Sequence, residues 1–170
     1  DADGAELPVE SIGEIAVRGP GVMRGYYRQP KETSNSFDPE GYLHTGDLGM
    51  MDEDGFVHLV GRKKEVMICS GYNVHPREVE DRLHSHPAVR EAMVAGVPDE
   101  LLGEAICACV LPEEGAIVTE PEIKDWCSVT LADYKVPDFV HFMDEFPLTG
   151  TGKIRRGELF RLIRMEHGQP

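Results

Sequence analysis

The sequence predicts an α+β fold, with helices packed on a small mixed or antiparallel sheet and a strand-rich segment in front of it. From about residue 64 onward, the hydrophobic periodicities follow the order strand, helix, strand, strand, helix, strand, helix. Residues 1–61 are instead rich in short alternating runs and turns, without a strong helical pattern. We therefore expect a domain boundary near Arg62, between residues 1–61 and residues 62–170.

The first segment contains three expected strands. Residues 12–19 alternate like a half-buried strand that ends at a Gly-Pro pair. A short irregular or helical stretch follows it. Residues 42–51 and 56–61 read as two further strands, joined by the turn sequence Asp-Glu-Asp-Gly at 52–55.

The next segment predicts a strand and then a helix. Residues 62–69 continue as a strand until the break at residues 70–73. A helix begins near Pro76, since the missing proline N–H costs nothing in a first turn. Glu78 and Arg82 are four residues apart, so we expect an ion pair between them.

Three strands and two helices complete the predicted fold. The strands cover residues 89–97, 104–111 and a region near 138–144. Thr119 and Glu122 form a capping-box signature ahead of a helix whose tryptophan should lie in the core. The apolar positions of this helix are Ile123, Trp126, Cys127, Leu131 and Tyr134. Those of the last helix are Leu159, Leu162 and Ile163.

Composition excludes several classes of protein. The chain has 170 residues, 41% of them hydrophobic, and a net charge of −14, which suits a soluble globular protein. So negative a charge argues against nucleic-acid binding and against attachment to an anionic membrane. No apolar run is long enough for a transmembrane segment. The chain begins with neither Met nor a signal-peptide pattern, so we expect an excised piece of a longer polypeptide.

The cysteines and histidines do not have the spacing of a metal site. None of the four cysteines forms a Cys-x-x-Cys pair, and the histidines are scattered. We expect reduced, mostly buried thiols in a cytoplasmic protein, and no metal site within this chain. The cysteines are Cys69, Cys107, Cys109 and Cys127.

The first candidate motif is Tyr42-Leu-His-Thr-Gly-Asp47. A carboxylate beside a glycine at the end of a strand can accept hydrogen bonds from two vicinal hydroxyls, which is the usual way in which a ribose is held. The alternative is an ordinary turn at a strand end.

The second motif runs from Gly61-Arg62 to the glycine at position 71. A guanidinium at a domain boundary can reach a nucleotide that is held between two domains. Gly71 permits a turn, or the close approach of a ligand to the backbone. A hairpin followed by a helix cap explains the same residues.

The third motif is Pro147-Leu-Thr-Gly-Thr-Gly-Lys153-Ile-Arg155. Two glycines expose the backbone just before a long cation, and further basic residues follow within an acidic chain. Such a cluster suits a phosphate or carboxylate ligand. A P-loop is excluded, because Pro147 and Ile154 occupy positions where that motif needs glycine and Ser or Thr. A solvated turn before an amphipathic helix is the alternative.

Together these motifs resemble the C-terminal part of the adenylate-forming superfamily, which includes acyl-CoA synthetases, peptide-synthetase adenylation domains and firefly luciferase. The resemblance covers nearly the whole chain, and it is closer to acyl- or aryl-CoA ligases than to peptide-synthetase domains. The matching stretches are Glu14-Ile-Ala-Val-Arg-Gly19, Gly25-Tyr-Tyr27, Thr45-Gly-Asp47, Gly61-Arg62, residues 70–80, Tyr134-Lys-Val-Pro137 and residues 149–155.

The resemblance implies two half-reactions at one site. A carboxylate attacks the α-phosphate of ATP in the presence of Mg²⁺, and coenzyme A then displaces AMP from the acyl-adenylate. It implies that Lys153 is the catalytic residue, bridging the substrate carboxylate and the α-phosphate. Asp47 would hold the ribose hydroxyls, and Arg62 and Tyr42 would contribute to nucleotide binding.

The resemblance also implies that residues 62–170 form a mobile lid that rotates between the half-reactions, after residues 1–61, the end of the N-terminal adenylation domain. Lys64 corresponds to the hinge. Gly71, Tyr72 and Asn73 would line the channel for the pantetheine of coenzyme A.

The rest of such an enzyme lies upstream of this chain. The phosphate loop, the adenine motif with its Mg²⁺-binding glutamate and the acyl pocket belong to the missing N-terminal domain, the expected partner in the same polypeptide. We therefore expect a fragment that is inactive alone and exposes the apolar side chains of Ile15, Val17, Tyr26 and Tyr27, or buries them in a fragment dimer.

The identity of the reaction partners stays open at this point. A fatty or other aliphatic acid is the expected substrate, with an aryl acid as the alternative. The acyl acceptor could also be a carrier protein. A non-catalytic binding domain is the third possibility, although the joint presence of Asp47, Arg62 and Lys153 speaks against a decayed site.

Overall fold

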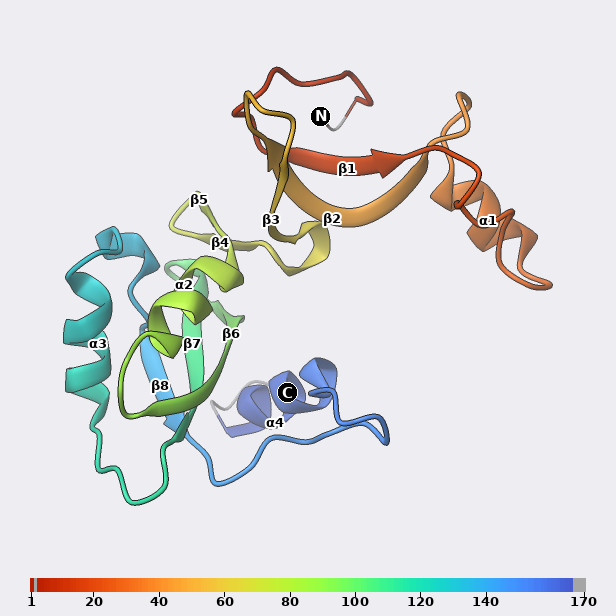
Figure 1. Ribbon diagram of the computed structural model, residues 1–170. Coiled ribbons are helices and arrows are strands. Elements are labelled where there is room, and N and C mark those ends of the chain that lie inside the picture. Colours follow the sequence, from red (N-terminus) through yellow and green to blue (C-terminus); the bar gives the residue numbers. More distant parts are fainter. Residues whose placement is uncertain (2, 167–170) are drawn as a thin grey trace. The chain divides into compact units, whose positions relative to one another are not determined.

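The computed structural model describes residues 1 and 3–166 (Figure 1). The chain divides into two compact units, which we call unit 1 (Asp1–Lys64) and unit 2 (from Glu65 onward). The boundary near Arg62 that the sequence suggested lies inside the last strand of unit 1.

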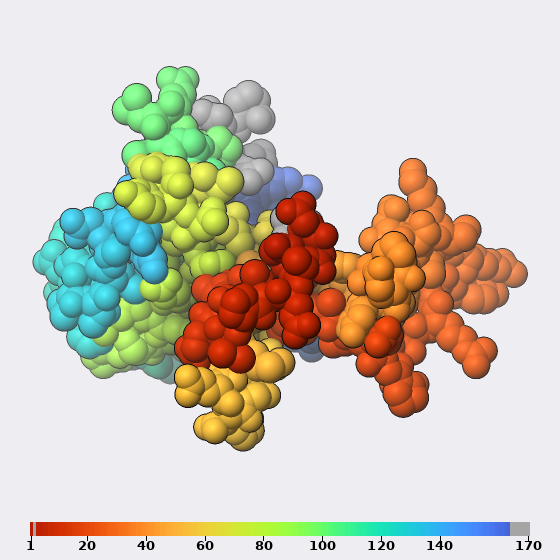
Figure 2. Space-filling model, turned by 90° about the horizontal axis from the view of Figure 1, so that it is seen from above, coloured from red at the N-terminus to blue at the C-terminus, as the bar shows by residue number. Residues whose placement is uncertain are grey.

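Unit 1 is built on a three-stranded antiparallel sheet in the order β1-β2-β3. The strands are β1 (Gly13–Val17), β2 (Leu43–Met51) and β3 (Val57–Arg62), close to the predicted ranges. A short helix, α1 (Pro30–Ser36), separates β1 from β2 and contains no buried residue. Figure 2 shows the orange segment that carries α1 at the surface.

Unit 1 has little core of its own. Gly49 alone is buried among its described residues. Tyr27 is 82% exposed, and Val17 and Tyr26 are exposed too, as predicted, whereas Ile15 is half-buried. Exposed apolar side chains of this kind are typical of a surface that contacts another polypeptide segment.

The sheet of unit 2 is mixed, as predicted. Its strands run in the order β5-β4-β7-β6 with antiparallel pairing, and β8 pairs with β7 in parallel. The strands are β4 (Met67–Cys69), β5 (Tyr72–Val74), β6 (Val89–Asp99), β7 (Gly103–Pro112) and β8 (Phe139–Phe142).

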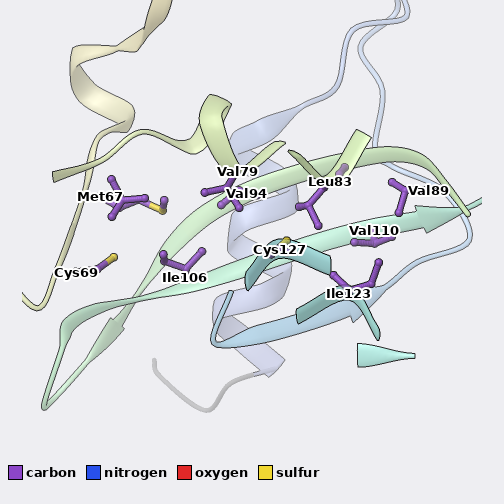
Figure 3. Close-up of a cluster of buried hydrophobic side chains, with 13 residues drawn as sticks. Met67, Cys69, Val79, Leu83, Val89, Val94, Ile106, Val110, Ile123 and Cys127 are labelled. Atoms are coloured by element: carbon purple, nitrogen blue, oxygen red, sulfur yellow. The ribbon is translucent and has the colours of Figure 1, made fainter. Parts of the chain in front are cut away.

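Helices cover both faces of this sheet (Figure 1). Helices α2 (Pro76–His84) and α3 (Glu120–Ser128) place Val79, Leu83 and Ile123 against one face. Figure 3 shows the side chains of this cluster pointing toward one another. Helix α4 (Arg156–Glu166) packs Leu159 and Ile163 against the other face. Because side chains alternate along a strand, β6 and β7 supply both cores.

The predicted continuous strand over residues 62–69 is right only at its two ends. Strand β3 extends to Arg62, and a 3₁₀ turn over Lys63–Glu65 separates it from the short β4. Three consecutive charged side chains suit a turn at the surface rather than a sheet interior. The predicted break at residues 70–73 is a hairpin turn that leads directly into β5.

The helix of the capping box is shorter than predicted. The Glu122 carboxylate accepts hydrogen bonds from the Thr119 amide at 2.8 Å and from its hydroxyl at 2.9 Å, as the sequence indicated. The helix ends at Ser128, so Leu131 and Tyr134 lie beyond it. Trp126 is half-buried rather than a core residue.

The contacts of Arg82 explain why Trp126 is only half-buried and why the predicted Glu78–Arg82 ion pair does not form. The Arg82 guanidinium lies 4.2 Å from the centre of the Trp126 ring and donates to the Trp126 carbonyl at 2.6 Å. The predicted Glu78–Arg82 pair is therefore wrong. The Glu78 carboxylate instead accepts from Nζ of Lys135, with both oxygens at 2.7 Å.

The four cysteines are buried and not in disulfides, as predicted. Burial raises the pKa of Cys69 and of Cys127 to about 11, so both thiols are protonated at neutral pH. Within residues 1 and 3–166, no group of three His, Cys, Asp or Glu side chains is arranged to hold a metal ion. No helix in this part of the chain is long and apolar enough to cross a membrane.

Candidate functional site

The first group of predicted site residues lies where β2 and β3 pair in unit 1. Asp47 and Arg62 are direct partners in this ladder. Nε of Arg62 lies 3.1 Å from Oδ1 of Asp47, and both side chains are at least one-third exposed. Because only one carboxylate oxygen is engaged in this pair, Asp47 can still accept hydrogen bonds from a ligand.

A pocket of about 310 Å³ opens beside this pair. It is lined by Thr45, Gly46 and the three consecutive cations Arg62, Lys63 and Lys64. Such a lining suits an anionic ligand, because each cation offers N–H donors to phosphate oxygens. Lys64 thus lines the pocket and is the last residue of unit 1.

Glu14 of β1 holds the wall of this pocket in place. One carboxylate oxygen accepts from the Gly46 amide at 3.1 Å, and the other from Nζ of Lys63 at 2.9 Å. Partial burial alone would raise the pKa of Glu14, but hydrogen bonds from Lys63, His44 and Gly46 together hold it below 4.5. The sequence reasoning did not single out Glu14 for this role.

Tyr42 does not line the pocket. The guanidinium of Arg18 lies 4.4 Å from the centre of its ring. Its backbone amide and carbonyl both bond to Asp38. Tyr42 therefore lies just before the start of β2, five residues before Asp47.

The second group forms the β4–β5 hairpin of unit 2. Ser70 and Gly71 have φ values of 51° and 82°, which is the left-handed conformation of a two-residue turn. Asn73 is exposed on β5 beside Tyr72. The Tyr72 ring stacks on Tyr134, with centroids 4.4 Å apart and planes 19° apart. This aromatic pair could support a flat or apolar ligand group, and neither partner is buried.

The third group is the loop that carries Lys153. Leu148 and Ile154 form a β-bridge at its base. Thr149 closes the tip, because its amide donates to the Lys153 carbonyl at 2.7 Å and its hydroxyl accepts from the Lys153 amide at 3.1 Å. Gly152 has a φ of 78° at this bend. The loop therefore has a defined backbone conformation.

The basic residues of this loop have different partners. Nη1 of Arg155, the residue before α4, lies 3.2 Å from the Glu158 carboxylate in that helix. Arg156 donates to Glu65 and to both oxygens of Glu80. Lys153 is exposed and forms no ion pair or side-chain hydrogen bond within the described residues. The arginines thus bind the chain's own carboxylates, and the lysine is left for a ligand.

Comparison with known proteins places the lysine loop and the fold of unit 2 in one protein family. Residues 78–153 match the family described as the AMP-binding enzyme C-terminal domain. The chain thus contains the C-terminal domain of the AMP-binding enzyme family. The match covers α2, the long strands β6 and β7, α3 and the lysine loop up to Lys153 itself.

Curated relatives that match this chain are named as acyl-CoA ligases. The medium-chain acyl-CoA ligase ACSF2, mitochondrial, of Rattus norvegicus is 42% identical over 147 residues, 86% of this chain and 24% of the relative. A long-chain-fatty-acid–CoA ligase of Bacillus subtilis (strain 168) is 46% identical over 86% of this chain and 26% of the relative. The chain spans about a quarter of the length of these relatives.

Solved structures agree with this family. ATP-bound MatB from Rhodopseudomonas palustris gives a TM-score of 0.89 at 38% identity, over 95% of this chain and 32% of that one. The amide bond synthetase McbA from Marinactinospora thermotolerans gives 0.88 at 40% identity, over 95% and 33%. The o-succinylbenzoate CoA synthetase MenE from Bacillus subtilis, in complex with its acyl-adenylate, gives 0.85 at 37%, over 92% and 32%.

Proposed function

We propose that this chain is the C-terminal part of an AMP-forming acyl-CoA ligase that acts on a fatty or other aliphatic acid. The observation that carries the proposal is Lys153, an exposed amine at the end of a hydrogen-bonded loop whose neighbouring arginines are occupied by carboxylates. The curated relatives are named as medium- and long-chain ligases, which favours an aliphatic acid over an aryl acid.

Lys153 has the chemistry that adenylate formation requires. Two anions must approach one another, and negative charge increases on the oxygens around phosphorus. A lysine ammonium has three donors on a flexible stem, so it can bind a carboxylate oxygen and a phosphate oxygen together. Neutralising and positioning both groups is worth several kcal/mol in rate (roughly 3 kcal/mol for a single oxyanion donor).

The nucleotide would be held by unit 1. Asp47 can accept hydrogen bonds from the ribose hydroxyls, and Arg62 and Lys63 border the neighbouring pocket. The described residues contain no cluster that fits Mg²⁺, and no step is assigned to the metal in this chain. Coenzyme A would pass the hairpin of Gly71, Tyr72 and Asn73, whose aromatic pair faces solvent.

The acyl acceptor is the second part of the proposal. The structural neighbours include enzymes named as a CoA synthetase and as an amide bond synthetase, so one C-terminal fold accompanies different acceptors. We propose coenzyme A because the curated relatives are named as CoA ligases. A phosphopantetheinylated carrier protein, assayed beside coenzyme A with the full-length enzyme, would distinguish the two.

The decisive experiment is Lys153→Ala in the full-length enzyme. We expect adenylate formation, measured by pyrophosphate exchange, to fall about a hundredfold or more, because the only cation assigned to both anions is lost. Conversion of a supplied acyl-adenylate to the thioester should be retained. Lys31→Ala, which removes an exposed lysine of α1, should leave both half-reactions unchanged. Equal loss of both half-reactions in Lys153→Ala contradicts the assignment.

Without the upstream domain we expect the chain alone to be inactive. The resemblance to adenylate-forming enzymes places the acid pocket and the phosphate loop in that upstream domain. Addition of ATP, a fatty acid and coenzyme A to the chain should therefore yield no thioester, as measured by chromatography.

A further inference from the structure

One cluster of charged side chains in unit 2 lies outside the residues assigned so far. Arg156 donates from Nη2 to the two carboxylate oxygens of Glu80 in α2, at 2.8 and 2.9 Å, and from Nη1 to Glu65. Glu80 is only 7% exposed, and it also accepts a 2.9 Å hydrogen bond from the Val94 amide of β6. One guanidinium thus joins the start of unit 2, helix α2 and helix α4.

The two ends of this connection are close in sequence to the proposed hinge and the proposed catalytic residue. Glu65 directly follows Lys64 and is the first residue of unit 2. Arg156 is three residues after Lys153 and begins α4. The cluster therefore links the backbone at the hinge to the base of the lysine loop, although 91 residues separate Glu65 from Arg156.

The position of Lys153 depends on how the loop is anchored, because hydrogen bonds within the loop restrict its backbone. Ile154 pairs with Leu148 and packs on the core beneath α4. The Arg155 amide donates to the Pro147 carbonyl at 2.8 Å. With the loop closed at both base and tip, the position of Lys153 depends on how firmly residues 154–156 are held.

Net stability does not explain why charges occupy this place. Taking a carboxylate and a guanidinium out of water costs about as much as their attraction returns, and apolar residues of similar volume often stabilise a core equally well. A forked guanidinium between two carboxylates does provide direction, because each hydrogen bond fixes a distance and an angle. Directional anchoring is what a loop with a reacting amine requires.

We propose that Arg156, Glu65 and Glu80 are positioning residues for Lys153. They hold the lysine loop at a fixed place relative to the backbone that follows Lys64, so that any rotation at the hinge carries the amine as part of one rigid body. This inference rests on the proposed function, since it requires Lys153 to act in adenylate formation.

Glu65→Gln in the full-length enzyme tests the proposal, because it leaves the buried Glu80 paired with Arg156. We expect kcat for adenylate formation to fall roughly ten- to a hundredfold with KM for ATP unchanged, since misplacing a reacting group by about 1 Å can cost that much. Thioester formation from a supplied acyl-adenylate and the melting temperature should stay at wild-type values. The control is Glu158→Gln, which removes the partner of Arg155 in α4 and should change neither half-reaction.

Arg156→Lys is the second variant. It keeps a positive charge beside Glu80 but lacks the fork that reaches two carboxylates, so it should show the same selective loss. Arg156→Gln is avoided because it leaves Glu80 buried without a cation. Wild-type rates in both Glu65→Gln and Arg156→Lys overturn the proposal, and so does an equal loss in both half-reactions with a lower melting temperature. If Lys153→Ala keeps adenylate formation, the proposed function itself fails.

Discussion

At the scale of single residues, the contrast between Lys153 and its neighbours is the most informative feature of the chain. The three basic residues Lys153, Arg155 and Arg156 looked equivalent as a cluster of charge, yet Arg155 and Arg156 are bound to carboxylates of unit 2. Of these three cations, only the Lys153 amine is therefore available to bind a ligand. A single flexible cation suits a role in which contact with the substrate is made and then broken.

Glu14 provides a residue-scale prediction of pH dependence. Its pKa in the folded chain lies below 4.5, so its bonds to Lys63 and Gly46 contribute stability above about pH 4.5 and lose it as the pH falls through the folded pKa. At pH 7 the free energy of unfolding of the wild-type chain, measured by thermal unfolding, should exceed that of Glu14→Gln by at most about 1 kcal/mol, since partly exposed pairs are screened.

The difference between the two proteins should shrink as the pH is lowered below 4.5 and through the lower pKa that Glu14 has in the folded chain. Other carboxylates with lowered pKa values, such as Asp52, titrate in both proteins and cancel from the difference. A difference that stays constant over this range would show that charge on Glu14 is not what stabilises the wall of the pocket.

At the scale of elements, the β4–β5 hairpin is defined by its turn. Gly71 has a φ of 82°, and a Cβ added there would meet no atom within 4 Å. The cost of a side chain is therefore conformational and not steric. Tyr72 follows directly and stacks on Tyr134 of another segment, so the turn decides where this aromatic pair forms.

We expect Gly71→Ala to lower the free energy of unfolding by about 1 kcal/mol, which is the cost of a left-handed conformation for a residue with a side chain. Urea denaturation of the chain measures this. Gly157→Ala is the matched control: the site lies in α4 and is also free of neighbours within 4 Å, so alanine should stabilise by about 0.5–1 kcal/mol. Stabilisation by both substitutions would mean that residue 71 does not adopt a positive φ in solution.

The 3₁₀ turn over Lys63–Glu65 is the element that separates the two units. The sequence suggested a continuous strand here. Instead, three charged residues form a turn between the last strand of unit 1 and the first strand of unit 2. A single short turn between compact units is a place where a few backbone angles can absorb a rotation. This supports the proposed hinge at Lys64, which stays a prediction.

At the scale of the whole molecule, Lys64→Pro tests that hinge in the full-length enzyme. Proline locks φ near −65°, so adenylate formation should continue while thioester formation falls about tenfold or more. Pyrophosphate exchange and thioester assays measure the two steps. Lys64→Ala removes the charge and leaves the backbone free, and it should retain both steps. Unchanged overall turnover in Lys64→Pro would remove Lys64 from this role.

The apolar surface of unit 1 also belongs to this scale. Phe56, Leu59 and Tyr27 are each more than half exposed, which fits a sheet that another part of the polypeptide covers. A dimer of the chain is the other way to bury this surface, and it stays a prediction. So does the cytoplasmic location, since the relatives include proteins named as mitochondrial as well as bacterial ones.

The sequence by itself determined the class of fold, most strands and helices, the capping box of α3, the buried thiols and the family. These depend on periodicity and on local spacing, which are written into neighbouring residues. The turn within residues 62–69 escaped this reasoning because strands flank it on both sides, so the predicted strand was extended across its three charged residues.

Only the tertiary structure decided which charges are paired and which aromatic rings meet. Arg156 binds Glu65 across 91 residues, Lys135 binds Glu78 across 57, and Tyr72 stacks on Tyr134. Such partners are chosen when strands and helices pack, because a long side chain binds the opposite charge that lies within its reach in space, not the one closest in sequence. That is why Lys153 could be named from its motif, whereas only the folded chain shows that its side chain has no ion pair among the residues that the structure describes.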